Sequence, residues 1–302
     1  MSDRVLTQSA LADLADVPAL SRWVRSGPVR LHVLDYGGEG VPLVVLPGIT
    51  SPAISMDFVA RELTDLVRPV VLDVRGRGLS DDGASYTLED YAADVEAVIR
   101  GLDLRRPLLL GHSMGARIAA ATAAESAVPL RGTVLVDPPM SGPARGPYPT
   151  TLVAFQSQLD QARRGTDADE VALSWPRWSR RERELRARWL ASCGAGAIAA
   201  THRGFETEDF FDTWPAVPAP SVLLYGAQSP VVTEAGAAEA ARANPTARLV
   251  EIPDAGHMVF WDNPGAALAA LREALSQWVP GNRYPATPGE TRMSSASGLA
   301  PE

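Results

Sequence analysis

Short runs of apolar residues recur along this chain, and helical patterns separate them. Residues 43–46 and 108–110 contain no polar side chain at all, as expected of strands that helices cover on both faces. Parallel strands need such crossover helices, so the pattern predicts an α/β protein with a doubly wound, mostly parallel sheet. The predicted strands are 29–36, 42–46, 69–74, 107–110, 132–136, 221–225 and 248–252.

The alternation of strands and helices stops after Asp137 and resumes at Ser221. The residues between them are rich in Pro, Arg and Trp and show no βα repeat. An insertion at the carboxyl end of a strand lies over the ligand crevice of such a sheet, so we predict a helical lid there. The predicted parts of the chain are an N-terminal extension at 1–20, a core at 21–137 and 221–280, the lid at 138–220 and a disordered tail at 281–302.

Charge and cysteine content exclude several classes of protein. The chain has 28 Lys and Arg against 36 Asp and Glu, a net charge of −8, which argues against a nucleic-acid partner. No window approaches about 18 consecutive apolar residues, so no membrane span is expected, and residues 1–18 lack the apolar segment of a secretory signal. A single cysteine, Cys193, excludes an internal disulfide and a cysteine-based zinc cage. These features predict a cytoplasmic enzyme and no particular oligomeric state.

One helix of the predicted lid is rich in arginine. Ser179 and Glu182 form a candidate capping box at its start, and Leu185 and Trp189 mark an apolar stripe. We interpret the arginines as a solvent-exposed face; they are Arg180, Arg181, Arg183, Arg186 and Arg188. Four tryptophans of the lid wall a small dry pocket or form the lid's own core, and both readings stay open: Trp175, Trp178, Trp189 and Trp214.

The candidate nucleophile is Ser113, in the sequence Gly-His-Ser-Met-Gly at 111–115. A bare Gly-x-Ser-x-Gly pattern is weak, but this one directly follows a predicted strand and opens an Ala-rich helix. On such a junction the turn is sharp, the flanking glycines let strand and helix pack closely, and the serine hydroxyl is exposed in a strained conformation. The position therefore predicts a nucleophilic serine.

A serine hydroxyl needs a general base, and the chain has four histidines. His32 lies in an early strand, His112 points away from the serine if the turn forms, and His202 lies in the insertion. His257 follows the strand 248–252 in a loop at the carboxyl edge of the sheet. That is where Ser113 is expected, so elimination favours His257 as the base.

Two carboxylates are candidates for orienting the ring of His257. Asp137 ends the strand 132–136 at the carboxyl edge of the sheet, while Glu234 stands in the first turn of a later helix. A carboxylate on the ring nitrogen that faces away from the serine fixes the tautomer and stabilises the imidazolium. We favour Asp137 over Glu234.

An oxyanion hole requires backbone N–H groups, which proline lacks. The Met114 N–H, at the positive end of the helix after Ser113, is one expected donor. The second is expected in the loop Pro47-Gly48-Ile49-Thr50, from the Ile49 N–H. We interpret the stretch 73–81 as a support for a neighbouring loop.

These residues, in this order, resemble the α/β-hydrolase superfamily across about residues 20–280. The resemblance rests on the elbow 111–115, the stretch 73–81 and the terminal Gly256-His257 pair. It implies an α/β-hydrolase fold with a helical lid inserted after the sixth strand.

Within this superfamily, the chain is similar to the N-formylmaleamate deformylases of aerobic nicotinate degradation. That family takes its triad aspartate after the sixth strand, and here Asp137 stands 24 residues and His257 144 residues after Ser113. Many other hydrolases carry the acid after the next strand, where this chain has Ser229. Four further segments carry the resemblance, and the last two lie in the predicted lid: 136–143, 225–232, 174–178 and 201–205.

The resemblance implies a serine hydrolase that cleaves the N-formyl C–N bond of N-formylmaleamate to give maleamate and formate, without metal or cofactor. Its substrate is a small anionic acyl amide, so the protein needs a local partner for a carboxylate. The candidate substrate-binding residues are Tyr148, Arg177, His202 and Arg203.

Two alternatives remain at this point. A general carboxylesterase or lactonase would use the same triad. A non-hydrolytic binding protein or a cofactor-free oxygenase on the same fold often keeps the serine and the histidine as well. Dehalogenase and epoxide-hydrolase chemistry is disfavoured, because those enzymes carry an aspartate at the elbow position occupied here by Ser113.

Overall fold

A computed structural model describes residues 14–280, and within them eight strands form one sheet in the order β1-β2-β4-β3-β5-β6-β7-β8. β2 is antiparallel to both of its neighbours, whereas β3 to β8 run parallel. This arrangement confirms the predicted α/β-hydrolase fold. The strands are β1 (Leu20–Ser26), β2 (Val29–Asp35), β3 (Val41–Leu46), β4 (Val67–Leu72), β5 (Leu108–His112), β6 (Gly132–Val136), β7 (Ser221–Gly226) and β8 (Arg248–Ile252).

The predicted strands agree with the observed ones to within two residues, but the sequence pattern missed β1. This strand lies at the edge of the sheet and forms a hairpin with β2. Its side chains are mostly exposed, including Trp23 at 47%, and only Val24 is buried. An edge strand with one buried side chain lacks the apolar run that marks the central strands. The predicted tail at 281–302 lies outside the described residues, as does most of the predicted extension at 1–20.

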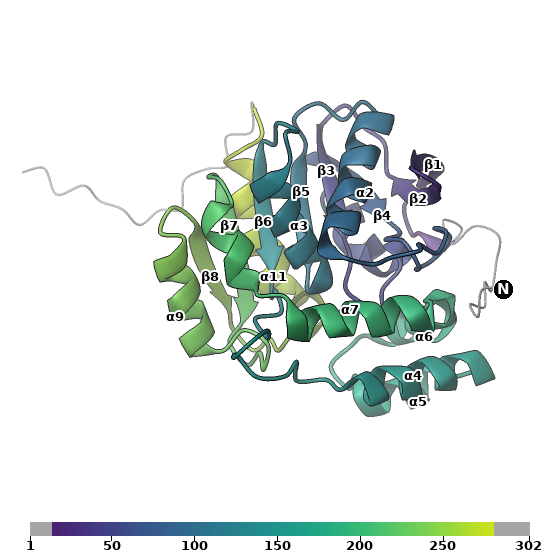
Figure 1. Ribbon diagram of the computed structural model, residues 1–302. Helices are drawn as coiled ribbons and strands as arrows, with labels where there is room; N and C mark the ends of the chain where they lie inside the picture. The colour runs from purple at the N-terminus through teal and green to yellow at the C-terminus, as the bar shows by residue number, and fades with distance from the viewer. Residues whose placement is uncertain (1–13, 281–302) are drawn as a thin grey trace, which may run out of the picture.

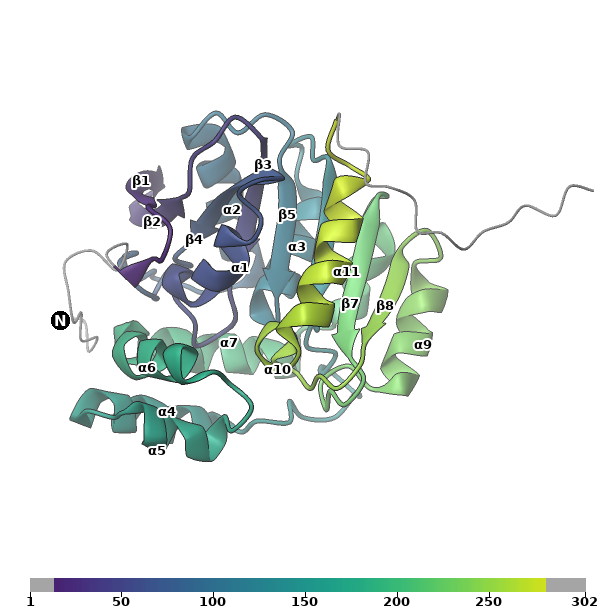
Figure 2. The same cartoon turned by 180° about the vertical axis from the view of Figure 1, so that it is seen from behind.

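Helices cover both faces of the sheet. α2 and α3 lie on one face, and α1 and α11 lie on the other (Figures 1 and 2). A capping box begins α2, since the Thr87 hydroxyl accepts from the Asp90 N–H and the Asp90 carboxylate accepts from the Thr87 N–H. The helical segments of the core are η2 (Ala53–Met56), α1 (Asp57–Arg61), α2 (Leu88–Gly101), α3 (Met114–Glu125), α9 (Glu234–Ala243), α10 (Val259–Asp262) and α11 (Pro264–Ser276). No helix in this described part of the chain is both long and apolar enough to traverse a bilayer.

The chain between β6 and β7 is mostly helical and lies across the carboxyl ends of the parallel strands (Figure 1). It leaves the sheet at the carboxyl end of β6, the edge at which β5 and β8 also end. We call residues 138–220 the insertion. Its helical segments are α4 (Leu152–Arg164), α5 (Ala168–Ser174), α6 (Arg180–Trp189), η3 (Leu190–Ser192), α7 (Ala195–Thr207), α8 (Phe210–Thr213) and η4 (Trp214–Ala216).

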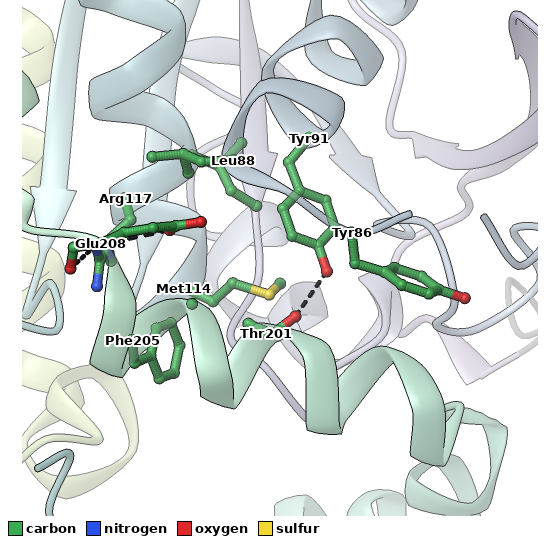
Figure 3. Close-up of a pocket in the computed structure, with 10 residues that line it drawn as sticks. Tyr86, Leu88, Tyr91, Met114, Arg117, Thr201, Phe205 and Glu208 are labelled. Atoms are coloured by element: carbon green, nitrogen blue, oxygen red, sulfur yellow. Dashed lines mark hydrogen bonds and ion pairs between the residues drawn. The ribbon is translucent and has the colours of Figure 1, made fainter. Parts of the chain in front are cut away.

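Helix α7 is the part of the insertion that is tied to the core by buried polar contacts. The Thr201 hydroxyl lies 2.6 Å from the Tyr91 hydroxyl and 2.9 Å from Nη2 of Arg77. After the helix, the carbonyl of Glu208 accepts a hydrogen bond from Nη2 of Arg117 on α3. Figure 3 shows Tyr91 of α2, Arg117 of α3 and Thr201 of α7 on the wall of a small cavity between these helices. The contacts hold α7 in a fixed position against α2 and α3.

The interpretation of the α6 arginines as a solvent-exposed face is wrong for Arg186. Only 3% of this residue is exposed. At 3.6 residues per turn, Arg186 lies on the same side of α6 as Leu185 and Trp189, and that side packs into the protein. Of the predicted capping box only one half is present. The Ser179 hydroxyl accepts from the Glu182 N–H at 3.3 Å, whereas the Glu182 carboxylate accepts from Nη1 of Arg181 and not from the Ser179 N–H.

We expect Gly115→Ala to destabilise the fold, because a Cβ at this position would collide with the carbonyl of Leu46 on β3. The contact is with backbone, so the helix or the strand must shift, and the free energy of unfolding should fall by at least about 2 kcal/mol. Gly196→Ala is the matched control, since that glycine lies exposed in α7 with nothing within 4 Å of the added Cβ. It should raise stability by about 0.5–1 kcal/mol. Urea denaturation of the two variants checks this, and equal stabilities would contradict the collision.

Candidate active site

Ser113 occupies the turn between β5 and α3 in a conformation that non-glycine residues rarely adopt. Its φ is 55° and its ψ is −118°, and such strain persists only where the surroundings over-determine it. The Ser113 N–H donates to the Val136 carbonyl at 2.8 Å. A Cβ on Gly111 would collide with the backbone of Gly115, so both flanking glycines are needed for the turn to close. The side chain is thereby fixed at the carboxyl edge of the sheet.

His257 lies in the loop after β8, with its Nε2 2.9 Å from the hydroxyl of Ser113. The neighbouring His112 supports this loop, because its Nε2 lies 3.0 Å from the carbonyl of His257. Burial lowers the pKa of His112 to about 3, so its imidazole is neutral at physiological pH and donates that bond from Nε2. The Gly256 N–H also donates to the Asp262 carboxylate at 2.9 Å. His112 therefore holds the backbone of His257 in place beside Ser113.

Asp137 is the carboxylate that the structure brings to His257. Its Oδ2 lies 2.7 Å from Nδ1 of the ring. The Ser229 hydroxyl donates to the same oxygen at 2.6 Å, and the Gly226 N–H donates to Oδ1 at 3.0 Å. All three partners are donors, which suits an ionised acceptor. The other candidate, Glu234, is exposed at the start of α9.

Two backbone N–H groups beside Ser113 have no acceptor in the described part of the chain. They belong to Ile49 and Met114, the predicted oxyanion donors. Met114 opens the twelve-residue helix α3, whose N-terminus carries partial positive charge. A Cβ built on Gly48 would lie only 3.6 Å from Cβ of Ser113, so the loop after β3 runs directly beside the serine. Arg77 fixes that loop, because its Nε donates to the Ile49 carbonyl at 3.1 Å.

The stretch 73–81 contacts this loop, as the sequence interpretation expected. The Asp73 carboxylate accepts from the Ala53 N–H at 2.6 Å and from the Leu79 N–H at 3.0 Å. It also lies 2.7 Å from Nδ1 of His32. Within residues 14–280, no group of three or more His, Cys, Asp or Glu side chains could hold a metal ion. The Asp73–His32 pair is therefore a connection between β2 and the loop after β4.

A cavity of about 170 Å³ opens between the sheet edge and the insertion. Tyr148 lies on its wall with the hydroxyl 3.2 Å from Nε2 of His257. Burial raises the pKa of the Tyr148 phenol, so the group remains a hydrogen-bond donor. The lining residues are Gly48, Ile49, Thr50, Ser51, His112, Ser113, Tyr148, Thr150, Phe155, Gln158, Ser174, Trp175, Arg186, His257 and Met258.

Of the four predicted substrate-binding residues, Tyr148 alone is on the wall of this cavity. His202 lies behind it, with Nε2 3.0 Å from the carbonyl of Thr150 and its ring edge-on to Tyr148. Arg177 lies on another cavity and donates to the Gln228 amide at 2.8 Å. Arg203 is exposed on α7. The structure therefore does not bring Arg177 and Arg203 to the serine.

The sequence interpretation missed Arg186, whose side chain reaches the cavity wall from α6. The available signal was its place on the same helix face as Leu185 and Trp189. Of the four tryptophans of the insertion, Trp175 lines the cavity. The others are buried in packed regions: Trp178, Trp189 and Trp214. The first reading therefore holds for Trp175. The second does not hold for Trp178 and Trp214, because Trp178 stacks on Trp261 of α10 and Trp214 donates to the Ala240 carbonyl of α9, both outside the insertion.

Comparison with known proteins agrees with this geometry. The model of the alpha/beta hydrolase family matches residues 43–271. N-formylmaleamate deformylase of Pseudomonas putida KT2440 is 39% identical over 254 residues, which cover 83% of this chain and 95% of that protein. The 2-(acetamidomethylene)succinate hydrolase of Mesorhizobium japonicum is 30% identical, covering 86% and 96%.

Solved structures agree with the sequence relatives. A crystal structure of an N-formylmaleamic acid deformylase from Pseudomonas putida superimposes with a TM-score of 0.79 at 35% identity, covering 83% of this chain and all of that one. The structure of E-2-(acetamidomethylene)succinate hydrolase superimposes with a TM-score of 0.71 at 27% identity, covering 85% and 99%. The family model, the relatives and the position of Ser113 on its strained turn lead to one conclusion: this chain belongs to the α/β hydrolase family.

Proposed function

We propose that this protein hydrolyses the N-formyl C–N bond of N-formylmaleamate and releases maleamate and formate. The observation that carries the proposal is the 39% identity to a deformylase over nearly all of that protein's length. The geometry supports it, because Ser113, His257 and Asp137 form a continuous hydrogen-bonded series at one end of a small cavity. The name of the second relative's substrate also contains an acylated nitrogen, the acetamido group.

In the first step, Oγ of Ser113 attacks the formyl carbon. His257 accepts the hydroxyl proton at Nε2, and Asp137 stabilises the resulting imidazolium through its bond to Nδ1. Negative charge develops on the formyl oxygen, where the Ile49 and Met114 N–H groups donate to it. Because these donors are already free and oriented, they need no rearrangement as the charge appears.

Collapse of the tetrahedral intermediate breaks the C–N bond. His257 gives its proton to the departing nitrogen, which leaves as the amide of maleamate. That nitrogen is flanked by a second acyl group, so it is a better leaving group than a simple amine. Water, deprotonated by His257, then attacks the formyl ester on Ser113 and releases formate.

Tyr148 is the proposed substrate-binding donor nearest to the reaction. Its hydroxyl lies 3.2 Å from Nε2 of His257, so it reaches the space that the formyl amide occupies during attack. His202 helps to hold this part of the insertion through its bond to the Thr150 carbonyl. The cavity of about 170 Å³ is below the roughly 300–1,000 Å³ of sites for drug-sized ligands, as expected for a substrate of this size.

We expect the purified protein to release formate from N-formylmaleamate, and Ser113→Ala to abolish the reaction. The variant removes only the nucleophilic oxygen, so thermal unfolding should be nearly unchanged. Coupled formate dehydrogenase detects the product, and mass spectrometry of maleamate checks the stoichiometry.

Simple aryl esters and 2-(acetamidomethylene)succinate serve as comparison substrates in the same assay. Turnover confined to aryl esters would support a general esterase instead. Formate release by Ser113→Ala at the wild-type rate would overturn the assignment of the nucleophile. An absence of turnover on every acyl substrate would support a non-hydrolytic relative.

We expect Asp137→Ala to lower kcat by about 10³–10⁴-fold, because His257 loses the group that fixes its tautomer and stabilises its charge. Glu234→Ala is the control, since Glu234 is exposed on α9, and its rate should stay within about twofold of wild type. Steady-state kinetics of formate release measures both variants. The reverse ranking would assign the acid to Glu234.

A further inference from the structure

Arg186 is a buried cation that pairs with no Asp or Glu of residues 14–280. Only 3% of the residue is exposed. In the described range 14–280 no Asp or Glu forms an ion pair with it, and its one hydrogen bond to a side chain runs from Nη2 to Oε1 of Gln158 at 2.9 Å. Its guanidinium carbon lies 5.4 Å from the ring centre of Trp175 and 5.7 Å from that of Trp178. These contacts fix the side chain. The buried Cys193 lies close enough to raise the pKa of the guanidinium against the larger effect of burial, but no carboxylate of residues 14–280 neutralises the charge.

An unpaired buried charge is costly, and proteins generally pair one or neutralise it. Burial lowers the pKa of Arg186 to about 10, which still leaves the guanidinium charged at physiological pH. The two tryptophan faces compensate only part of the desolvation. A charge kept at this cost indicates an anion that binds to it.

The charge faces the cavity that contains Ser113. Arg186 lines this cavity together with Ser113 and His257, and no Asp or Glu of residues 14–280 is on its wall. The other side of Arg186 borders a much smaller cavity lined by Glu170. The Glu170 carboxylate is engaged elsewhere, accepting from the Thr166 hydroxyl at 2.7 Å. An anion that reaches Arg186 therefore enters through the cavity with the serine.

We infer that Arg186 binds the carboxylate of the substrate and so selects acyl amides that carry one. The inference rests on the proposed function, which identifies the bond that reacts. The burial of Arg186 in the wall of the cavity is an observation that does not depend on that function. Gln158 occupies one guanidinium nitrogen, and the remaining N–H groups stay available for a carboxylate, which arginine binds with two parallel bonds. Trp175 and Trp178 hold the guanidinium plane in place.

The other arginines considered for this role do not meet its requirements. Arg177 already donates to the Asp254 carbonyl and the Gln228 amide, away from the serine. Arg203 is exposed on α7. An ion pair between a carboxylate and a solvent-exposed arginine contributes little binding free energy. A carboxylate bound to Arg186 would instead be desolvated within the active-site cavity.

Binding of a carboxylate can be measured without turnover, in a protein that carries Ser113→Ala. Titration calorimetry with maleate and with maleamate gives the affinity, and Arg186→Gln in that background should weaken both by at least about 30-fold. Arg188→Gln is the matched control, because Arg188 is on the same helix but exposed, and it should bind as tightly as the parent. Arg186→Lys should give an intermediate affinity, since it keeps the charge but loses the planar pair of donors.

A stability measurement separates binding from a merely structural role. Arg186→Met removes the buried charge and keeps much of the volume, so we expect its free energy of unfolding in urea to equal or exceed that of wild type. Maleate binding should nevertheless be lost. A large loss of stability in Arg186→Met together with wild-type affinity in folded Arg186→Lys and Arg186→Gln would show a structural role and overturn the inference.

The remaining outcomes distinguish this inference from the proposed function. Maleate binding that depends on Arg186, in a protein that releases no formate from N-formylmaleamate, supports the carboxylate site and contradicts the proposed substrate. Formate release combined with equal maleate affinity in the Arg186→Gln and Arg188→Gln variants supports the substrate and overturns the inference. A wild-type preference for N-formylmaleamate over its neutral methyl ester that persists in Arg186→Gln would also overturn it.

Discussion

The close approach of α3 to β3 is the constraint on which the site depends. Gly115 lies so near the carbonyl of Leu46 that any side chain there would collide with it. This contact forces the turn after β5 to be sharp and holds Ser113 at φ 55°. Because β3 is the hydrogen-bonded neighbour of β5, the same approach brings the loop of Ile49 beside the serine. Ser113 and the backbone N–H groups of Ile49 and Met114 are thus positioned by backbone packing, and no side chain of the insertion is needed for it.

The carboxylate of Asp137 comes from the end of one strand and is supported by the loop after the neighbouring strand. β6 and β7 are adjacent and parallel, so residues after either strand reach the ring of His257. Here Asp137, after β6, contacts the ring, and its backbone N–H donates a hydrogen bond to the Leu224 carbonyl of β7. Ser229, after β7, donates to the carboxylate. The loop after β7 therefore supports a carboxylate that the chain supplies after β6.

In the proposed reaction, chemistry and specificity come from different parts of the chain. The sheet edge supplies Ser113, His257 and Asp137, whereas the insertion supplies Tyr148 and Arg186. The chain as a whole is negative, so long-range attraction does not favour the proposed anionic substrate, and its recognition has to be local. The cavity wall built by residues 14–280 contains the guanidinium of Arg186 and no carboxylate, which meets that requirement because burial strengthens the interaction of the guanidinium with an anion.

The sequence by itself determined the parallel sheet, the bounds of β6 and β8, the strained serine turn and, by elimination among four histidines, His257. These features are encoded locally, in apolar runs, helical periodicity and glycines that a turn requires. The tertiary structure decided what depends on distant neighbours. It brought Asp137 rather than Glu234 to the histidine, and it added β1 at an edge where few side chains are buried. It also buried Arg186, because the exposure of a helix face depends on which segments pack against it, and sequence periodicity does not specify those segments.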